Sequence, residues 1–114
     1  MKLIKSFSYA WQGLRSAWKS ELNLRIHAGA GVVVLGAGFY FRVTSTEWAV
    51  LLMAMALVIS LELVNTAIEN LTDLVTKDSD PLAGKVKDIA AAAVVIGSLA
   101  AALAGVIIFS NYIF

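Results

Sequence analysis

The chain has 114 residues, a formal net charge of +1 and no cysteine, and 60% of its residues are apolar. A water-soluble domain of this length would expose large apolar patches at a mean hydropathy of +0.81, so the composition indicates a membrane protein. The missing cysteines exclude disulfides and thiolate metal sites, and the nearly neutral charge argues against a nucleic-acid partner. The length predicts one domain, residues 1–114, with no cleavable signal peptide at its start.

The first predicted element is an amphipathic helix over residues 3–24. Apolar residues recur every three or four positions, Trp11 and Trp18 among them, while Lys5 and Lys19 fall on the opposite side. Its frequent polar residues prevent it from crossing a bilayer, and a basic face opposite tryptophans suits a helix that lies in the membrane interface. The alternative is a soluble helix that packs on a partner.

Two apolar segments follow, at about residues 26–41 and 48–75, and each predicts a transmembrane helix. The first would cover only about 24 Å at 1.5 Å per residue, so the flanking Arg25 and Arg42 are expected to snorkel. The second would reach roughly 42 Å and should project its polar end beyond the hydrocarbon core. Residues 42–47 between them are predicted to form a short polar turn.

A polar connector at residues 76–85 contains the only proline and precedes a third predicted span at about residues 87–109. Small residues step by four along one side of this span, which favours close helix packing over a pore; they are Ala93, Gly97, Ala101 and Gly105. Three spans are too few to enclose a site alone, which favours a homo-oligomer. The fold class predicted is therefore an all-α membrane protein with a surface helix and three transmembrane helices.

The basic residues predict the orientation of these spans. Eight of the nine Lys and Arg residues lie in the N-terminal helix or the second connector, which leaves Arg42 alone in the first turn. By the positive-inside rule, we expect the N-terminus and the second connector to be cytoplasmic, and the first turn and the C-terminus to lie outside. The polar end of the second span would then face the cytoplasm.

That polar end carries an acidic stripe. Residues 62–73 read ELVNTAIENLTD, and at about 100° per residue Glu62, Asn65, Glu69 and Asp73 share a sector of roughly 80°. A carboxylate at membrane depth is costly unless it faces a protein interior, a charge or a watery cavity, so we interpret Glu62 as functional. Asp73 fits ordinary polarity at a helix end equally well.

Glu21 is expected beside the apolar stripe of the N-terminal helix, where an acid requires a counter-charge. Arg25, four residues on, could supply it in an ordinary helix pair. If Glu21 instead faces Glu69 across a helix interface, the two carboxylates would need a divalent cation between them, and hard oxygen ligands favour magnesium.

Lys87 and Asp88 open the third span, where a helix start and a lysine can hold a phosphate, although membrane anchoring explains both residues as well. His27, at the head of the first span, is interpreted as a boundary or hydrogen-bonding residue rather than a catalyst. A metal-bound nucleotide beside a buried carboxylate fits phosphoryl transfer to a lipid alcohol. No P-loop accompanies it, because the pair Gly84-Lys85 lacks the required pattern.

These residues resemble a known family, the small prokaryotic integral-membrane diacylglycerol kinases. Residues 62–73 match its signature E-x-x-N-(S/T)-A-(I/V)-E-x-x-x-D. KDIAAAAV at residues 87–94 resembles the start of the family's last helix, and SYAWQGLRSAW at residues 8–18 resembles its surface helix. ELNLRIH at residues 21–27 is similar to the segment E-x-N-x-R-I-H of the undecaprenol kinase branch.

The resemblance implies a homotrimer of three-span protomers that transfers the γ-phosphate of ATP to a lipid hydroxyl at the cytoplasmic face of a bacterial cell membrane. It also implies roles for the matching positions: Glu62 as general base at the lipid hydroxyl, Glu21 and Glu69 as ligands of the Mg²⁺ that accompanies ATP, Asn65 as a positioning residue of the nucleotide site, Lys87 and Asp88 in contact with ATP, Tyr9 nearby, and Arg15 and Trp18 near the lipid acceptor. At Asp80 and Gly84 the chain departs from the branch, which often has histidine and lysine there.

The lipid acceptor has two candidates, undecaprenol, which the branch favours, and diacylglycerol, whose product would be phosphatidic acid. A hypothesis of another class is a non-enzymatic membrane scaffold or ion-conducting oligomer, in which the acids serve packing or ion passage. The acids cluster at one boundary instead of recurring through the spans, which argues against that third hypothesis.

Overall fold

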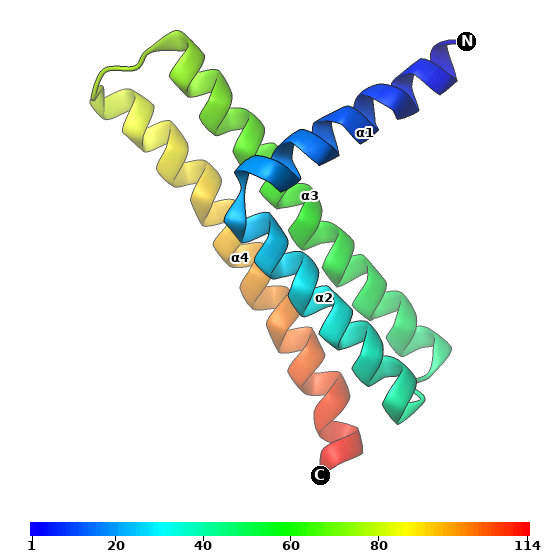
Figure 1. The fold of residues 1–114 in the computed structure, drawn as a ribbon. Coiled ribbons are helices and arrows are strands. Elements are labelled where there is room, and N and C mark those ends of the chain that lie inside the picture. Colours follow the sequence, from blue (N-terminus) through cyan, green and yellow to red (C-terminus); the bar gives the residue numbers. More distant parts are fainter.

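The computed structural model describes residues 1–114, which form four α-helices and no β-strand. The helices are α1 (Lys2–Ser20), α2 (Leu22–Phe41), α3 (Ser45–Val75) and α4 (Pro81–Ile113). The last two form a long antiparallel pair, α2 packs alongside them, chiefly on α3, and α1 crosses the bundle near the start of α2 (Figure 1). Three of the helices are long and apolar enough to span a membrane, whereas α1 is shorter and more polar, which confirms the predicted fold class.

A single extended residue separates α1 from α2. Glu21 has φ −115° and ψ 107°, so α1 ends before it and not at residue 24 as predicted. A helix in the interface must turn toward the membrane normal before the chain can span, and this non-helical residue makes the turn. The Arg25 guanidinium donates hydrogen bonds to the carbonyls of Trp18 (2.9 Å) and Lys19 (3.4 Å), which are left unpaired at the end of α1. Arg25 therefore caps α1 and does not pair with Glu21.

The first span is longer than predicted. α2 begins at Leu22 rather than near residue 26, and its 20 residues cover about 30 Å, which matches the hydrocarbon core. The expected shortfall therefore disappears, and no snorkelling arginine is required to correct it. Arg42 follows the helix in a left-handed conformation (φ 54°, ψ 52°), which closes the last turn of α2.

A capping box starts the second span. The Glu47 N–H donates to Thr44 Oγ1 (3.2 Å), and the Thr44 N–H donates to Glu47 Oε1 (2.9 Å). α3 consequently begins at Ser45, and the predicted polar turn shortens to residues 42–44. The pattern T-x-x-E that forms this cap is present in the sequence.

Asp80 caps the last helix. Its carboxylate accepts hydrogen bonds from the N–H groups of Leu82 (2.8 Å) and Ala83 (3.4 Å), and Pro81 occupies the first helical position. The predicted polar connector therefore shortens to residues 76–80. At 1.5 Å per residue α3 and α4 measure about 47 and 50 Å, so both extend well beyond a core of about 30 Å.

The best-packed cluster lies where α2 passes into α3, at the end of the spans opposite the α3–α4 connection. Its buried members are Val43, Leu51 and Ile108. At the same end the Tyr112 hydroxyl of α4 donates a hydrogen bond to Glu47 of α3. Aromatic and aliphatic packing together with this bond therefore holds one end of the helix pair.

Glycines allow close helix contact at two places. A Cβ on Gly38 would lie 2.6 Å from the ring of Trp48, and a Cβ on Gly97 would lie 2.4 Å from Leu61 Cδ1. The prediction of close packing by the small-residue ridge of the third span is therefore confirmed at Gly97. At Gly105 a Cβ would meet no atom within 4 Å, and this residue lines a cavity.

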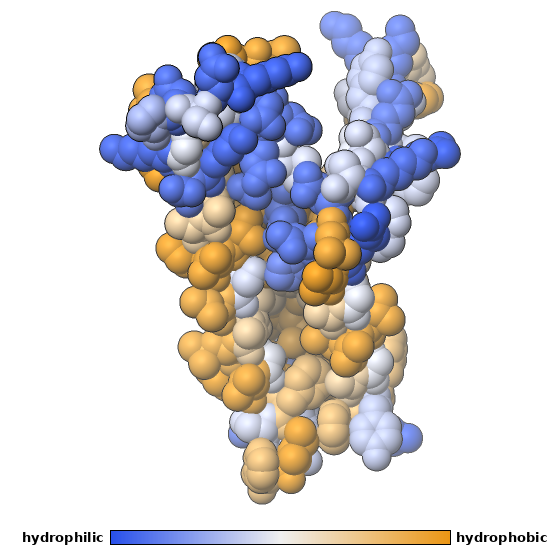
Figure 2. Space-filling model, turned by 60° about the vertical axis from the view of Figure 1, so that its left-hand side comes forward, coloured by the Kyte–Doolittle hydropathy of each residue, from blue (hydrophilic) through white to orange (hydrophobic).

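Most of the apolar surface is exposed, since only 11 of the 114 residues are buried within the chain. Figure 2 shows hydrophobic residues over most of the part formed by the spans, whereas hydrophilic residues gather at the end that carries α1 and the α3–α4 connection. An apolar surface of this extent is stable in contact with lipid or with other protein, as expected of membrane spans.

Candidate functional site

Glu62 is the only charged side chain buried within the chain, with 3% of its surface exposed. It lies on α3, where the hydroxyl of Thr66 donates a hydrogen bond back to the Glu62 carbonyl (2.9 Å). A buried carboxylate has lost most of its hydration, so it must be compensated by a partner.

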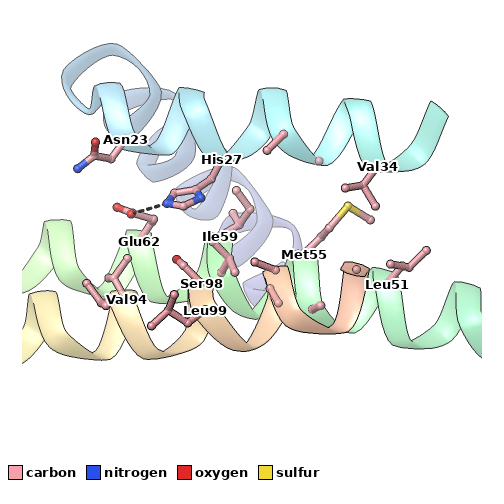
Figure 3. Close-up of a pocket in the computed structure, with 18 residues that line it drawn as sticks. Asn23, His27, Val34, Leu51, Met55, Ile59, Glu62, Val94, Ser98 and Leu99 are labelled. Carbon is pink, nitrogen blue, oxygen red and sulfur yellow. Dashed lines mark ion pairs between the residues drawn. The ribbon is translucent and has the colours of Figure 1, made fainter. Parts of the chain in front are cut away.

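That partner comes from α2. His27 Nε2 lies 3.2 Å from Glu62 Oε1, and the imidazole points from α2 toward the carboxylate on α3 (Figure 3). His27 is five residues beyond the start of α2, about 8 Å along the helix, which places the pair just inside the apolar level of a spanning α2. The histidine interpreted as a hydrogen-bonding residue thus has the buried acid as its partner.

An open cavity of about 640 Å³ lies between α2, α3 and α4. Its lining is largely apolar, and Glu62, His27 and Asn23 gather at one end of it (Figure 3). Ser98 of α4 also lines the cavity, and its buried Oγ has no hydrogen-bond partner. A space of this shape suits an apolar chain whose polar end meets the Glu62 carboxylate.

A second apolar groove, of about 750 Å³, lies between α1, α2 and α3. Arg15 and Trp18, which were expected near a lipid acceptor, both line this groove. His27 lines the groove as well as the cavity, so it stands between the two spaces. The structure therefore brings Arg15 and Trp18 to the far side of the histidine that contacts Glu62.

The next turn of the acidic stripe forms a pair of its own. Asn65 Nδ2 donates a hydrogen bond to Glu69 Oε1 (3.4 Å), while Asn65 Oδ1 is buried without a partner. An unpaired amide oxygen next to a carboxylate is a hard-oxygen donor set that fits Mg²⁺. The chain contains no cluster of three or more acidic or histidine side chains placed to hold a metal, so these two oxygens would need further ligands.

The last acid of the stripe joins the projecting ends of α3 and α4. Lys87 Nζ lies 2.6 Å from Asp73 Oδ1, in an ion pair that is open to solvent and therefore contributes little to stability. Both residues line a polar hollow of about 430 Å³ beside the α3–α4 connection, and Asp78 and Asp80 line it too. Lys87, expected to contact ATP, thus stands in a polar hollow with a carboxylate as its present partner.

Three predicted site residues form no side-chain hydrogen bond or ion pair. Glu21 is half-buried between α1 and α2, and neither a hydrogen bond nor an ion pair joins it to Glu69. Tyr9, which is 67% exposed on α1, and Asp88, which is exposed on α4, have no side-chain partner. The meeting of Glu21 with Glu69 stays a prediction.

A family model described as prokaryotic diacylglycerol kinase matches residues 8–109 of the chain. The chain belongs to this family. The undecaprenol kinase of Bacillus subtilis is 37% identical over 108 residues, which are 95% of this chain and 88% of that protein. The diacylglycerol kinase of Synechocystis is 40% identical over 104 residues, 90% of this chain and 59% of that protein. The diacylglycerol kinase of Escherichia coli K12 is 30% identical over 102 residues, 90% of this chain and 84% of that protein.

Membership in the prokaryotic diacylglycerol kinase family makes the chain a membrane-bound lipid kinase, with ATP as phosphoryl donor and a lipid as acceptor. The scaffold and ion-conduction hypothesis is therefore set aside. Sequence reasoning missed the cavity residues Asn23 and Ser98, and it did not identify Glu62 as the partner of His27. Asn23 and His27 both belong to the E-x-N-x-R-I-H segment, which could have identified them, and Ser98 is a hydroxyl in an otherwise apolar span.

Proposed function

We propose that this lipid kinase transfers the γ-phosphate of ATP to the hydroxyl of undecaprenol, which yields undecaprenyl phosphate, and that residues 1–114 act as one domain. The observation that carries the proposal is the burial of Glu62 at one end of an apolar cavity. A proton acceptor at the polar end of an open apolar space suits phosphorylation of a long-chain alcohol, whose chain can extend from the cavity into the surrounding lipid.

Glu62 is the general base of the proposed reaction. The lipid places its chain along the apolar lining of the cavity and its hydroxyl at the carboxylate. Glu62 takes the hydroxyl proton as the lipid oxygen bonds to the γ-phosphorus, the bond from that phosphorus to the bridging oxygen breaks, and ADP leaves. The proton passes from Glu62 to water when the phosphorylated lipid is released. Arg15 and Trp18 contact the acceptor from the neighbouring groove.

The nucleotide binds on the hydrophilic side of the carboxylate, where α3 and α4 project beyond the apolar level. Lys87 exchanges Asp73 for a phosphate oxygen, which replaces one ion pair by another and keeps the lysine charge compensated. Asp88 and Tyr9 are the remaining proposed nucleotide contacts. Both are exposed and lack side-chain partners, so they are available to a ligand.

Asn65, Glu69 and Glu21 are the residues that would hold the Mg²⁺ delivered with ATP. The unpaired Asn65 Oδ1 and the adjacent Glu69 carboxylate support this assignment, and Glu21 would add a ligand from another segment of the chain. Mg²⁺ bound there would offset the negative charge of the phosphates. The family resemblance further supports a homotrimer, in which neighbouring copies could complete the ligand set.

The proposed orientation places the N-terminus and the active site in the cytoplasm and the C-terminus outside. The distribution of Lys and Arg supports it, because Arg42 is the only one of them at the α2–α3 turn. The hydrophilic end of the molecule, where α1 and the α3–α4 connection lie, would then face cytoplasmic ATP (Figure 2).

Diacylglycerol is the second candidate acceptor. The relative from Synechocystis is named a diacylglycerol kinase and is 40% identical, and two separate apolar spaces meet at His27, where a lipid with two chains could place one chain in each. Undecaprenol is preferred because the E-x-N-x-R-I-H segment and a 37% identical undecaprenol kinase both point to it.

A side-by-side assay decides between the acceptors. The purified kinase in lipid nanodiscs receives labelled ATP and Mg²⁺ with undecaprenol or diacylglycerol at matched mole fractions, and the labelled lipid is separated and counted. We expect kcat/KM for undecaprenol to exceed that for diacylglycerol at least tenfold. A tenfold preference for diacylglycerol would show that diacylglycerol, and not undecaprenol, is the acceptor. No transfer to either lipid would refute the proposed function.

A further inference from the structure

The buried Glu62 carboxylate has one partner, and that partner is the only histidine of the chain. A carboxylate can only accept hydrogen bonds, so the contact of 3.2 Å between His27 Nε2 and Glu62 Oε1 requires a proton on Nε2. The imidazole thus stands at ion-pairing distance from one carboxylate oxygen, Oε1, and no side chain pairs with the other oxygen, Oε2.

We propose that His27 is the positioning residue of the general base: it holds Oε1 of Glu62 and thereby leaves Oε2 as the oxygen that receives the proton of the lipid hydroxyl. This role rests on the proposed function of Glu62. His27 does not touch the reacting atoms and acts only through the carboxylate.

The need for such a residue follows from the cavity. A glutamate has three side-chain torsions, and the open space of about 640 Å³ beside Glu62 gives its carboxylate room to adopt other rotamers. His27 comes from a different helix, so its 3.2 Å contact holds the carboxylate relative to α2 as well as α3. A base that is held within hydrogen-bonding distance of the hydroxyl avoids the roughly 10²-fold loss of rate that a misplacement of about 1 Å can cause.

The position of His27 between the two apolar spaces agrees with this role. The imidazole lines both the cavity and the groove of Arg15 and Trp18, whereas Glu62 lines the cavity alone. An acceptor chain in the cavity therefore reaches both members of the pair (Figure 3). No other charged side chain of the chain is within ion-pairing distance of Glu62, so nothing else in the chain replaces His27 if it is removed.

Steady-state kinetics with the lipid acceptor test the role. His27→Ala should lower kcat by about 10²-fold and change KM for ATP and for the lipid less than threefold, because the base is misplaced while the binding surfaces remain. His27→Gln retains an N–H donor near the position of Nε2 and should recover at least tenfold of that loss. Gly29→Ala is the matched control on α2, where a Cβ meets no atom, and should keep wild-type kinetics.

Some kinetic results would overturn the role. An Ala variant with wild-type kcat would show that Glu62 needs no positioning. Equal losses of kcat and of thermal stability in the Ala and Gln variants would show that His27 is merely structural. If the wild-type protein phosphorylates neither lipid, the proposed function fails; if it does and His27→Ala is equally active, only the positioning role fails.

A spectroscopic measurement on the folded protein tests the contact without relying on turnover. Because the chain has a single histidine, a sample labelled with ¹⁵N-histidine gives signals from one imidazole only. In the wild-type protein we expect Nε2 to carry the proton and its ¹⁵N and ¹H shifts to change clearly in Glu62→Gln, which removes the charge of the acceptor. Identical imidazole shifts in the two proteins would show that the pair does not form, and would overturn the proposal.

Discussion

Replacing Glu62 by glutamine tests the proposed base with the least disturbance of its surroundings. The amide has nearly the shape of the carboxylate, and its oxygen can still face His27 Nε2 as an acceptor. The substitution thus removes the proton acceptor while it retains the packing of a residue that is almost wholly buried. We expect Glu62→Gln to fold as the wild-type protein does and to lose most of its turnover.

The size of the two effects follows from the structure. General-base catalysis contributes about 10²–10⁴-fold, so kcat should fall by that factor, which corresponds to about 2.7–5.4 kcal/mol of transition-state stabilisation. The change in unfolding free energy should stay within about 1 kcal/mol, because the shape of the side chain is retained and a charge is removed from an apolar environment.

The assay compares labelled phosphate transfer with thermal unfolding in the same nanodiscs. Glu47→Gln is the matched control, since it changes another glutamate of α3 that lies in the capping box at the far end of the helix. We expect this control to lower the melting temperature and to keep kcat. Wild-type turnover in Glu62→Gln would refute the base assignment, and so would a loss of turnover that merely parallels a loss of folded protein.

Three further substitutions test the packing and caps that hold the helices. Tyr112→Phe removes the hydrogen bond to Glu47 and should lower the melting temperature; an unchanged value would show that the bond is not formed. Gly38→Ala places a Cβ 2.6 Å from the Trp48 ring and should cost about 1–3 kcal/mol, with a shift in tryptophan emission as the sign of the displaced ring. Asp80→Ala removes the N-cap of α4 and should cost about 0.5–2 kcal/mol; Asp80→Asn, which can still cap, should recover most of it.

The sequence predicts the number and the membrane character of the helices, because runs of apolar residues and their polar interruptions are local properties. It places the ends of those helices less well. Glu21 was counted in the first helix because its neighbours continue the apolar period, whereas the structure uses it as an extended residue between two helices that take different directions. That change of direction depends on the membrane and on the contact of Arg25 with the end of α1. Neither can be read from the spacing of apolar residues along the sequence.

The start of α3 and of α4 could have been predicted more closely. Thr44 and Glu47 form a capping box with the expected spacing, and Asp80 followed by Pro81 is a typical helix start. Apolar content was instead used to mark the boundaries, which placed the start of both spans after the cap.

In the candidate site, the spacing within α3 places Glu62, Asn65 and Glu69 on one face. The apolar residues before Glu62 predict that this acid is buried and therefore functional. They do not predict which residue of another helix meets that acid. The pairing of His27 with Glu62 depends on how α2 packs across α3, which is a property of the folded chain. For the same reason Lys87 was matched to ATP while its contact with Asp73 went unpredicted.

The cluster of Val43, Leu51 and Ile108 and the hydrogen bond of Tyr112 lie at the end of the spans remote from the acidic stripe. Leu51 and Glu62 are eleven residues apart on α3, about 16 Å along its axis. This cluster therefore holds the helices together at the end away from Glu62, although Leu51 belongs both to the cluster and to the wall of the cavity. Exposed wall residues such as Val95 and Leu99 can accordingly vary, and with them the shape of the proposed lipid cavity, while Leu51 and Val58 are constrained by the packing of the helices.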